Sequence, residues 1–402
     1  MTQENYFDNI SESPIFRDKS PLDPEITPER DKIVCRDKQI KQLASHLTDM
    51  VQYGTAKNLL ITGDTGVGKT ATTKVILSDL ERKLAHQNFR NLYMTDMKNE
   101  RNVLRKISKK LDLNFRGQSN LEEYYDRLED KLIEKDMKVA LVLDEVDKLF
   151  EKSTQKDHGN SLFKRLLEVR NKVNSSEGGY LLIIGITNNV DTPGYFSPRV
   201  DSRFGRETIH FPSYNANELK KILKARAEEA MKPKTLDQGA LSKAAAIVAK
   251  KDGDARKAII LLRKAGEIAE EAGETQILKK HLDRAERMLE EERIMDSIKE
   301  CSSHSQLVLY AALDLKDKPS VSTGDLYSKY QKFAKRNASS ALTQRRVRDL
   351  IDKLDMMGLI TAEIKSRGRG KGRTRQISIN FGDDTMETIE SYLEDKFGDL
   401  TK

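Results

Sequence analysis

The chain has 402 residues, 34% of them charged, and a formal net charge of +7 at pH 7; this length predicts two or three domains. No apolar run is long enough to span a membrane, the polar N-terminus is unlike a secretory signal, and the two distant cysteines argue against a disulfide framework or a zinc site. These exclusions predict a soluble, cytoplasmic protein.

The positive charge of the chain is concentrated in one region near its C-terminal end. Between Leu326 and Arg375 there are fourteen lysines and arginines against four acidic residues, so the rest of the chain is slightly acidic. A localised basic patch is the electrostatic signature of a nucleic-acid interface, whereas a diffuse excess of charge carries little information. The C-terminal region therefore predicts contact with nucleic acid.

The first half of the chain has the pattern of an α/β domain. Residues 1 to about 20 are polar and predict a flexible leader, and from residue 21 to about 212 short apolar runs alternate with amphipathic stretches. That alternation is typical of a three-layer domain with a parallel sheet. Apolar residues at helical spacing predict a helix over residues 37–52. The predicted strands cover residues 58–63, 89–95, 139–145, 180–188 and 207–212.

The second half of the chain predicts two further domains. Residues 213–300 show only helical patterns and predict a small helical domain. Within residues 301–402, alternation over 360–364 and 376–381 predicts two half-buried strands of a hairpin joined by a glycine-rich basic loop. The alternation places Ile364 on the buried face of the first of these strands.

A phosphate-binding loop follows the first predicted strand. The sequence "GDTGVGKT" at residues 63–70 matches GxxxxGK[ST] at every fixed position and opens a helix. Backbone N–H groups of such a loop surround phosphate oxygens, and the helix N-terminus favours their charge. Lys69 is expected to reach the β- and γ-phosphates and Thr70 to ligate Mg²⁺. The expected nucleotide-binding residues are Gly63, Asp64, Thr65, Gly66, Val67, Gly68, Lys69, Thr70 and Ala71.

Acidic and polar residues follow two of the other predicted strands. Asp144 and Glu145 end the apolar run "VALVL", at the sheet edge where α/β proteins bind ligands. Asp144 is expected to hold Mg²⁺ through water and Glu145 to deprotonate the attacking water, although an acidic first helical turn is the plainer alternative. Asn188 ends the next strand and is expected to contact the γ-phosphate or the water, with an ordinary strand-ending turn as its rival.

Several arginines are candidates for contacts with the nucleotide. Arg199, Arg203 and Arg206 surround a short predicted helix, and one of them can act in trans as an arginine finger, or all can form surface ion pairs. Arg256 lies at the start of a helix of the second domain, where the helix dipole disfavours a cation. That small cost suggests that Arg256 contacts a phosphate across the domain cleft.

Further segments complete the pattern of a known family. The chain also contains "FPSYNANELKKILKAR", "GDARKAIILLRKAGEIAE", "HSQLVLYAAL" and "LTQRRVRDLIDKLDMMGLI". From about residue 15 to 381 it resembles the AAA+ ATPases that serve as archaeal origin-recognition and helicase-loading initiators. The resemblance implies an α/β fold: a AAA+ P-loop three-layer parallel-sheet domain (21–212), a helical lid (213–300) and a C-terminal winged-helix domain (301–402).

The resemblance also assigns roles by position. It implies that Lys69 and Thr70 belong to Walker A, Asp144 and Glu145 to Walker B, Asn188 to sensor 1 and Arg256 to sensor 2. Residues before the first helix line the adenine pocket in this family, which adds Ile33, Val34 and Arg36, and the lid motif adds Tyr214 and Arg226.

Two further features of the family bear on this chain. A helical insertion after the second strand touches DNA in the family, which points to Arg101 and Arg105. Asn189 stands where family members often carry an acidic residue, so the choice between Arg199 and Arg203 as the finger stays open.

The basic C-terminal region fits the DNA-binding part of a winged helix. A helix capped by Thr343 would bury an apolar stripe from Val347 to Met357 and turn its arginines toward a DNA groove. The basic loop would be the wing, where glycine permits close approach and arginine favours a narrow minor groove; a solvated surface loop is the alternative. The expected DNA-binding residues are Thr343, Gln344, Arg345, Arg346, Arg348, Arg367, Gly368, Arg369, Lys371 and Arg373.

These observations, taken with the resemblance, imply an ATP-dependent, slowly hydrolysing replication initiator. It would use ATP or ADP with Mg²⁺, bind double-stranded origin DNA in the nucleoid, and recruit the replicative helicase, with a second initiator subunit or another copy of itself as partner and no membrane. The alternatives are an ATP-gated winged-helix transcriptional regulator, which usually carries repeats or a sensor domain, and a clamp-loader-like subunit, which needs no basic winged helix. The helical domain and the third domain disfavour a small-molecule kinase.

Overall fold

The computed structural model describes most of the chain as two compact units, one ending at Arg284 and the other starting at Ala285. The residues described are 12–113, 120–150, 153–176, 178–189, 194, 196–204, 206–318, 320–337, 340–366, 373–379 and 381–400. None of the helices in these ranges is both long enough and apolar enough to cross a membrane.

The first unit is built on a parallel sheet of five strands in the order β2-β3-β4-β1-β5. Each strand coincides with a predicted one to within one or two residues, so the predicted parallel sheet is confirmed. The order places β1, which leads into the phosphate-binding loop, between β4 and β5. The strands are β1 Leu59–Thr62, β2 Phe89–Met94, β3 Lys138–Leu143, β4 Tyr180–Thr187 and β5 Glu207–His210.

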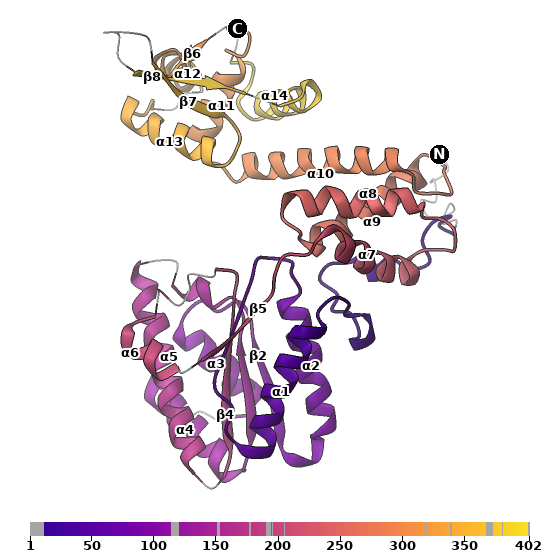
Figure 1. Ribbon diagram of the computed structural model, residues 1–402. Coiled ribbons are helices and arrows are strands. Elements are labelled where there is room, and N and C mark those ends of the chain that lie inside the picture. The colour runs from indigo at the N-terminus through magenta and orange to yellow at the C-terminus, as the bar shows by residue number, and fades with distance from the viewer. Residues whose placement is uncertain are drawn as a thin grey trace, which may run out of the picture. The chain divides into compact units, whose positions relative to one another are not determined.

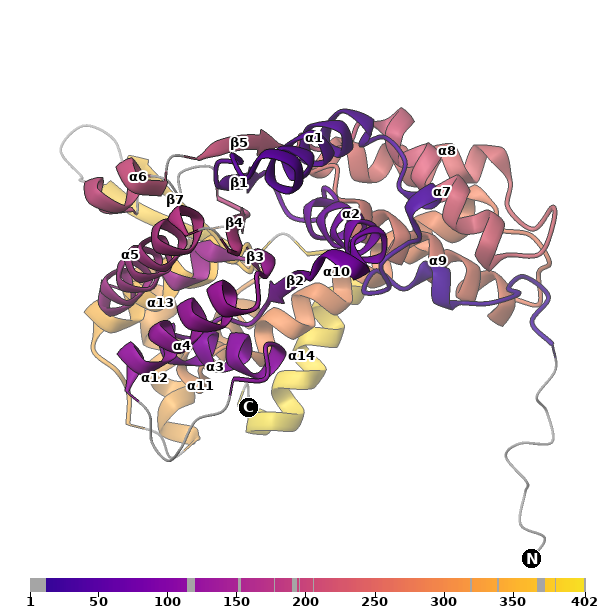
Figure 2. The ribbon, with the colours of Figure 1, turned by 90° about the horizontal axis from the view of Figure 1, so that it is seen from below.

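Helices cover both faces of this sheet, as Figures 1 and 2 show. Residues of β3 alternate between two hydrophobic clusters: Val139 and Leu141 belong to the cluster of α3–α6, and Ala140 and Val142 to the cluster of α1 and α2. Such burial on both faces explains the nearly continuous apolar runs of β1, β3 and β4. The helices are α1 Asp37–Tyr53, α2 Lys69–Lys83, α3 Glu100–Lys110, α4 Leu121–Glu134, α5 Ser153–Ser175 and α6 Pro198–Phe204. Short 3₁₀ turns cover Ser20–Leu22, Arg30–Lys32, Ala85–Gln87 and Val146–Leu149.

The helical lid follows β5 within the same unit. Its helices begin at side-chain caps, because Asn215 accepts hydrogen bonds from the backbone at the start of α7, Asp237 does so at α8 and Asp254 at α9. The helices are α7 Ala216–Ala230, α8 Gln238–Lys251, α9 Ala255–Glu271 and α10 Lys279–Lys299, the last of which continues past residue 284.

The prediction of a flexible leader up to residue 20 is wrong for its last part. Ile15 and Phe16 are buried, and Phe16 forms a β-bridge with Met231 just after α7. The segment is ordered because these two apolar side chains are buried. The sequence did not predict this, because too few apolar residues surround them to form a recognisable pattern. The segment starting at Ser13 is therefore part of the lid.

The second unit has the helices and the antiparallel sheet expected of a winged helix. Its sheet has the order β6-β8-β7, in which β6 (Val321–Ser322) was not predicted because two residues give no alternation. Ile364, expected on the buried face, is 67% exposed, because β7 runs out of the hydrophobic core beyond Ala362. The remaining elements are α11 Ser303–Leu313, α12 Thr323–Arg336, α13 Gln344–Met356, β7 Thr361–Ser366, β8 Arg373–Ser378 and α14 Asp383–Phe397.

Candidate functional site

The phosphate-binding loop lies between the end of β1 and the start of α2. Gly66 has a φ of 69°, and a Cβ at this position would collide with the carboxylate of Asp254 in the lid. Gly68, with a φ of 87°, is the N-cap of α2. Glycine is needed at both positions because other residues rarely adopt this left-handed backbone. The loop is thus shaped to present backbone N–H groups, with the lid packed directly against it.

The side chain of Lys69 is buried and turned back over this loop. Its Nζ donates hydrogen bonds to the carbonyls of Gly63 at 2.8 Å and Asp64 at 2.6 Å, and to Oδ1 of Asn188 at 2.9 Å. Burial lowers the pKa of Lys69 to about 8, against the raising effect of Asp144 and Asp147. The ammonium of Lys69 therefore links the phosphate-binding loop to Asn188 at the end of β4.

A carboxylate site suitable for Mg²⁺ lies beside Lys69. Oδ2 of Asp144 accepts hydrogen bonds from Oγ1 of Thr70 at 3.0 Å and from the hydroxyl of Tyr93 at 2.8 Å. Burial raises the pKa of Asp144. Mg²⁺ in nucleotide sites uses hard oxygen ligands, commonly one or two carboxylates with the phosphates, so a hydroxyl and a carboxylate in contact fit it.

Tyr93 was not anticipated by the sequence reasoning. It is the penultimate residue of β2, and β2 pairs with β3, which ends one residue before Asp144. The sequence could have indicated Tyr93, because it is a polar side chain at the end of a strand that lies next to the strand of the acidic motif. Tyr93 orients the carboxylate in the way that outer-shell partners orient metal ligands.

Glu145 adopts an unusual backbone conformation. Its φ is 57° and its ψ is 49°, a left-handed conformation that costs about 1–2 kcal/mol in a residue with a side chain. Strain of this kind is retained mainly at functional sites. The carboxylate forms an ion pair with Lys148 at 2.6 Å and lies on the wall of the pocket.

Asn188 is positioned by Asp147, an acidic residue that was not predicted to belong to the site. Oδ1 of Asp147 accepts hydrogen bonds from Oγ1 of Thr187 at 3.0 Å and from the backbone N–H of Asn188 at 3.3 Å. Asp147 follows Glu145 by two residues, so its closeness to Asp144 and Glu145 in the sequence could have indicated that it belongs to the site. These contacts fix the end of β4, where Asn188 meets Lys69.

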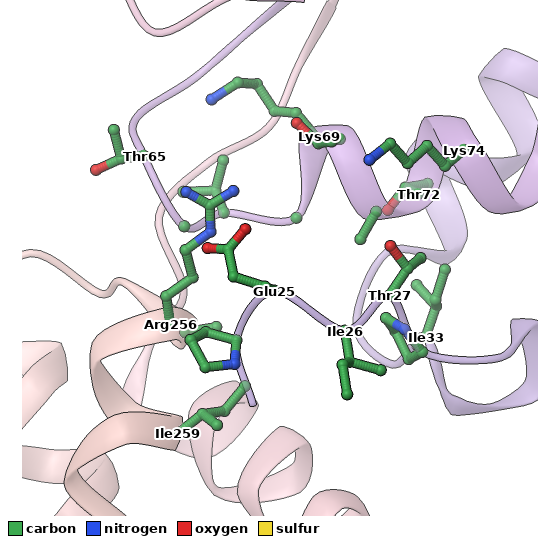
Figure 3. A pocket seen from close by; sticks show the side chains of 18 of the residues that line it. Glu25, Ile26, Thr27, Ile33, Thr65, Lys69, Thr72, Lys74, Arg256 and Ile259 are labelled. Atoms are coloured by element: carbon green, nitrogen blue, oxygen red, sulfur yellow. The ribbon is translucent and has the colours of Figure 1, made fainter. Parts of the chain in front are cut away.

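A cavity of about 500 Å³ extends from the phosphate-binding loop to the lid (Figure 3). The cavity is lined both by charged side chains such as Lys69 and Arg256 and by apolar side chains such as Ile33 and Ile259. This mixed lining suits a nucleotide, with its charged phosphates and apolar base. Of the predicted residues, the cavity is lined by Ile33, Val34, Thr65, Gly66, Val67, Gly68, Lys69, Thr70, Ala71, Asp144, Glu145, Asn188, Tyr214, Arg226 and Arg256.

Gly63 and Asp64, also predicted to bind the nucleotide, do not line this cavity, and their carbonyls accept hydrogen bonds from Lys69. Arg36 does not line the cavity either, contrary to the prediction. It is 2% exposed, and it donates to the carbonyls of Val67 at 2.9 Å and Pro212 at 2.7 Å while its guanidinium lies 3.6 Å from the centre of the Tyr214 ring. Arginine is suited to such combined stacking and hydrogen bonding. Arg36 thus ties the phosphate-binding loop to the start of the lid.

The candidate finger residues Arg199 and Arg203 lie on α6 and Arg206 follows its end, and none of the three is among the described residues that line the cavity. Arg203 is 3.5 Å from Glu168 of α5, Arg206 forms an ion pair with Asp201, and Arg199 is exposed. The surface ion pairs foreseen as an alternative are present for two of the three. A residue that acts on a neighbouring subunit must be exposed, and Arg199 and Arg203 are. The assignment of one of them as the arginine finger therefore stays a prediction.

The predicted recognition helix, α13, presents a basic face to solvent. Oγ1 of Thr343 accepts a hydrogen bond from the backbone of Arg346, as expected of its N-cap. Val347, Ile351 and Leu354 are buried, whereas Thr343, Gln344, Arg345, Arg346 and Arg348 are exposed. The apolar stripe is confirmed.

The strand β8 at the end of the predicted wing and the insertion helix α3 hold further predicted DNA-contacting residues. β8 begins at Arg373, and Arg375 in the same strand forms an ion pair with Asp352 of α13, which links the hairpin to the helix. The predicted wing residues Arg367, Gly368, Arg369 and Lys371 lie outside the described residues. In the first unit, Arg101 and Arg105 are exposed one turn apart on α3.

Comparison with protein-family profiles identifies each part of the chain. Residues 32–184 match the AAA ATPase domain, residues 220–287 the Cdc6 AAA+ ATPase-type lid domain, and residues 296–389 the CDC6 C-terminal winged-helix domain. The sheet, phosphate-binding loop, lid and winged helix thus define a AAA+ ATPase with a C-terminal winged-helix domain.

Curated relatives and solved structures agree with this class. The chain is 34% identical over 400 residues to ORC1-type DNA replication protein 1 of Sulfurisphaera tokodaii (98% of this chain and 97% of that protein), and 35% identical to the ORC1-type DNA replication protein of Thermococcus onnurineus (94% and 92%). The chain belongs to the family of ORC1-type DNA replication proteins. The Aeropyrum pernix ORC1 protein, solved in complex with DNA, has a TM-score of 0.78 and 31% identity, covering 96% of this chain and 99% of that chain.

Proposed function

We propose that this protein is an ATP-dependent replication initiator that binds duplex origin DNA and helps to recruit the replicative helicase. The observation that carries the proposal is the exposed basic face of α13 in a chain that also holds a cavity lined by the phosphate-binding loop. That its relative from Aeropyrum pernix was solved in complex with DNA supports the same reading.

The proposed nucleotide chemistry follows from the residues around the cavity. Backbone N–H groups of the loop and the ammonium of Lys69 bind the phosphates, for which Lys69 exchanges its carbonyl partners. Thr70 and Asp144 hold Mg²⁺, which when bound neutralises charge on the phosphates. Glu145 accepts the proton of the attacking water, and Asn188 orients that water or the γ-phosphate.

The proposed cycle depends on the lid. Arg256, at the start of α9, lines the same cavity as Lys69 and is the lid residue placed to contact a phosphate. ATP would thus draw the lid and the ATPase core together, and an arginine of α6 from a second subunit or another copy of the chain would complete the site. Slow hydrolysis would then reset the DNA-bound complex.

The DNA-binding part of the proposal predicts the effect of two substitutions. A variant carrying Arg345→Ala and Arg348→Ala should bind duplex DNA at least about tenfold more weakly, because an arginine contact with DNA contributes about 1–3 kcal/mol. The slope of log affinity against log salt should become less steep by about one unit for each arginine that no longer pairs with a phosphate. Fluorescence anisotropy with a labelled duplex over a salt series measures both.

A charge-matched control separates recognition from general attraction. Lys221 and Lys224 are exposed on α7 of the lid, so replacing both with alanine removes the same charge from another surface. This control should retain the affinity of the unmodified chain. Equal weakening by the two double variants would remove α13 from the DNA interface.

A further inference from the structure

A network of hydrogen bonds joins α11, α12 and the start of α13, three helices of the second unit (Figure 1). Nδ1 of His304, on α11, lies 2.8 Å from the hydroxyl oxygen of Tyr330, on α12. The same hydroxyl accepts a hydrogen bond from the backbone N–H of Leu342 at 3.1 Å. Leu342 directly precedes Thr343, the N-cap of α13. The network thus ends at the point where the basic helix begins.

The backbone of Leu342 is held through both of its polar groups. Tyr327 lies three residues before Tyr330 on α12, so the two side chains share one face of the helix. The hydroxyl of Tyr327 donates to the carbonyl of Leu342 at 3.2 Å and accepts from Nε2 of Gln331 at 3.1 Å. The N–H and the carbonyl of a single residue are therefore both bound by side chains of α12.

Packing supports these hydrogen bonds. Tyr330 is fully buried, and its ring stacks on that of Tyr327 with 6.4 Å between the ring centres. Tyr327 and Leu342 are partly buried against the same hydrophobic core. Burial raises the pKa of Tyr330, so its hydroxyl keeps its proton. A hydrogen bond in such a place is costly to lose, because the group left behind is poorly solvated.

The hydroxyl protons of the network have a consistent direction. Tyr327 accepts from Gln331 and donates to the carbonyl of Leu342. Tyr330 accepts from the N–H of Leu342, which leaves its own proton for Nδ1 of His304. This arrangement satisfies both hydroxyls when Nδ1 is the acceptor nitrogen of the imidazole. A polar network in which every member is satisfied makes the structure around it rigid.

A fixed Leu342 determines where α13 begins. The next residue, Thr343, caps the helix by accepting from the backbone of Arg346, and Arg345 and Arg348 are exposed in the turns that follow. In helix-turn-helix proteins the N-terminal residues of the recognition helix contact the base edges. Side chains that are already held in a binding orientation lose less conformational freedom when they bind.

We propose that Tyr327, Tyr330 and His304 are positioning residues for the binding of duplex DNA by α13. They hold Leu342, and through it the first turns of α13, in the orientation in which the arginines of this helix reach the duplex. The three residues act through α13 and need no contact of their own with DNA. The inference rests on the proposed function of α13 in DNA binding.

Removal of single hydroxyl groups tests this inference in the full-length chain. Tyr330→Phe and Tyr327→Phe keep the rings, and each should weaken duplex binding at least about threefold, as expected for one lost hydrogen bond. Tyr392→Phe changes a half-buried tyrosine of α14 in the same unit and should bind like the unmodified chain. Fluorescence anisotropy with a labelled duplex, at fixed salt with ATP, measures all three.

A double-mutant cycle separates positioning from a general loss of stability. In a chain that already carries Arg345→Ala and Arg348→Ala, Tyr330→Phe should weaken binding clearly less than it does in the unmodified chain. The reason is that the side chains positioned by the network are then absent. A hydroxyl that only stabilised the fold would weaken binding by the same factor in both backgrounds, and such equal losses would overturn the inference.

Two substitutions of His304 test the far end of the network. His304→Leu, which has no acceptor, should weaken duplex binding, whereas His304→Asn, which keeps an acceptor close to the place of Nδ1, should restore most of the affinity. Equal weakening by both would overturn the role of His304. If the variant with Arg345→Ala and Arg348→Ala binds weakly but both tyrosine variants bind normally, the inference fails and the DNA interface stands. If that arginine variant binds normally, the proposed function of α13 fails and the inference fails with it.

Discussion

Replacing Glu145 with glutamine should slow ATP hydrolysis at least about 100-fold and leave the affinity for ATP within about threefold of the unmodified value. The rate falls because an amide cannot accept a proton from the attacking water, and a positioned general base contributes about 10²–10⁴-fold. Binding persists because the phosphates are held by the loop, Lys69 and Thr70. Duplex binding with ATP should persist as well, since hydrolysis follows it.

The measurement is phosphate release under saturating ATP, paired with ATP affinity by fluorescence titration. Glu134→Gln, which removes an equivalent exposed carboxylate at the end of α4, is the matched control and should hydrolyse ATP at the unmodified rate. Hydrolysis that continues unchanged in Glu145→Gln would show that the base is another group. Loss of ATP binding would instead mean that the ion pair with Lys148 shapes the pocket.

Replacing Lys69 with alanine should weaken ATP binding about 100-fold or more. The ammonium is expected to bind two phosphate groups, and each hydrogen bond to a charged group contributes about 1.5–3 kcal/mol. Lys83→Ala removes an exposed lysine from the last turn of the same helix and should bind ATP normally. Equilibrium titration with a fluorescent ATP analogue measures both, and equal affinities would contradict the assigned role of Lys69.

The lowered pKa of Lys69 adds a pH dependence to ATP binding. Burial lowers this pKa to about 8 in the free protein, whereas bound phosphates favour the protonated form and raise it again. ATP affinity should therefore be flat below about pH 7 and fall by up to about tenfold per pH unit above pH 8, because the lysine must then take up a proton to bind. In Lys69→Arg, whose side chain stays protonated, the decline above pH 8 should disappear.

The sequence predicted those parts of the fold that rest on long, regular patterns. The strands β1, β3 and β4 of the parallel sheet were predicted because each is a nearly uninterrupted apolar run, and α13 because its apolar residues recur at helical spacing over three turns. β6 was missed because two residues carry no period, and Ile364 was misplaced because alternation does not reveal where a strand leaves the core.

The contacts within the candidate site were less predictable than its motifs. The loop residues and Asp144 follow from local spacing, whereas Arg36, Tyr93 and Arg226 act through contacts with segments far away in the sequence. Long arginine side chains in particular reach backbone carbonyls that no pattern marks. The burial of Ile15 and Phe16 was not predicted for a similar reason, because both side chains are isolated in a polar, proline-containing stretch.

The most direct test of an ATP-dependent origin-binding initiator is its preference between two DNA duplexes. One duplex carries an inverted-repeat-rich noncoding segment flanking the gene of this protein, and the other is a shuffled copy of equal length. Fluorescence anisotropy at fixed salt with ATP should show a preference of about 100-fold for the first, equivalent to about 2.7 kcal/mol. Equal affinity for the two duplexes would contradict sequence-specific origin recognition and leave an ATPase that binds DNA through its phosphates alone.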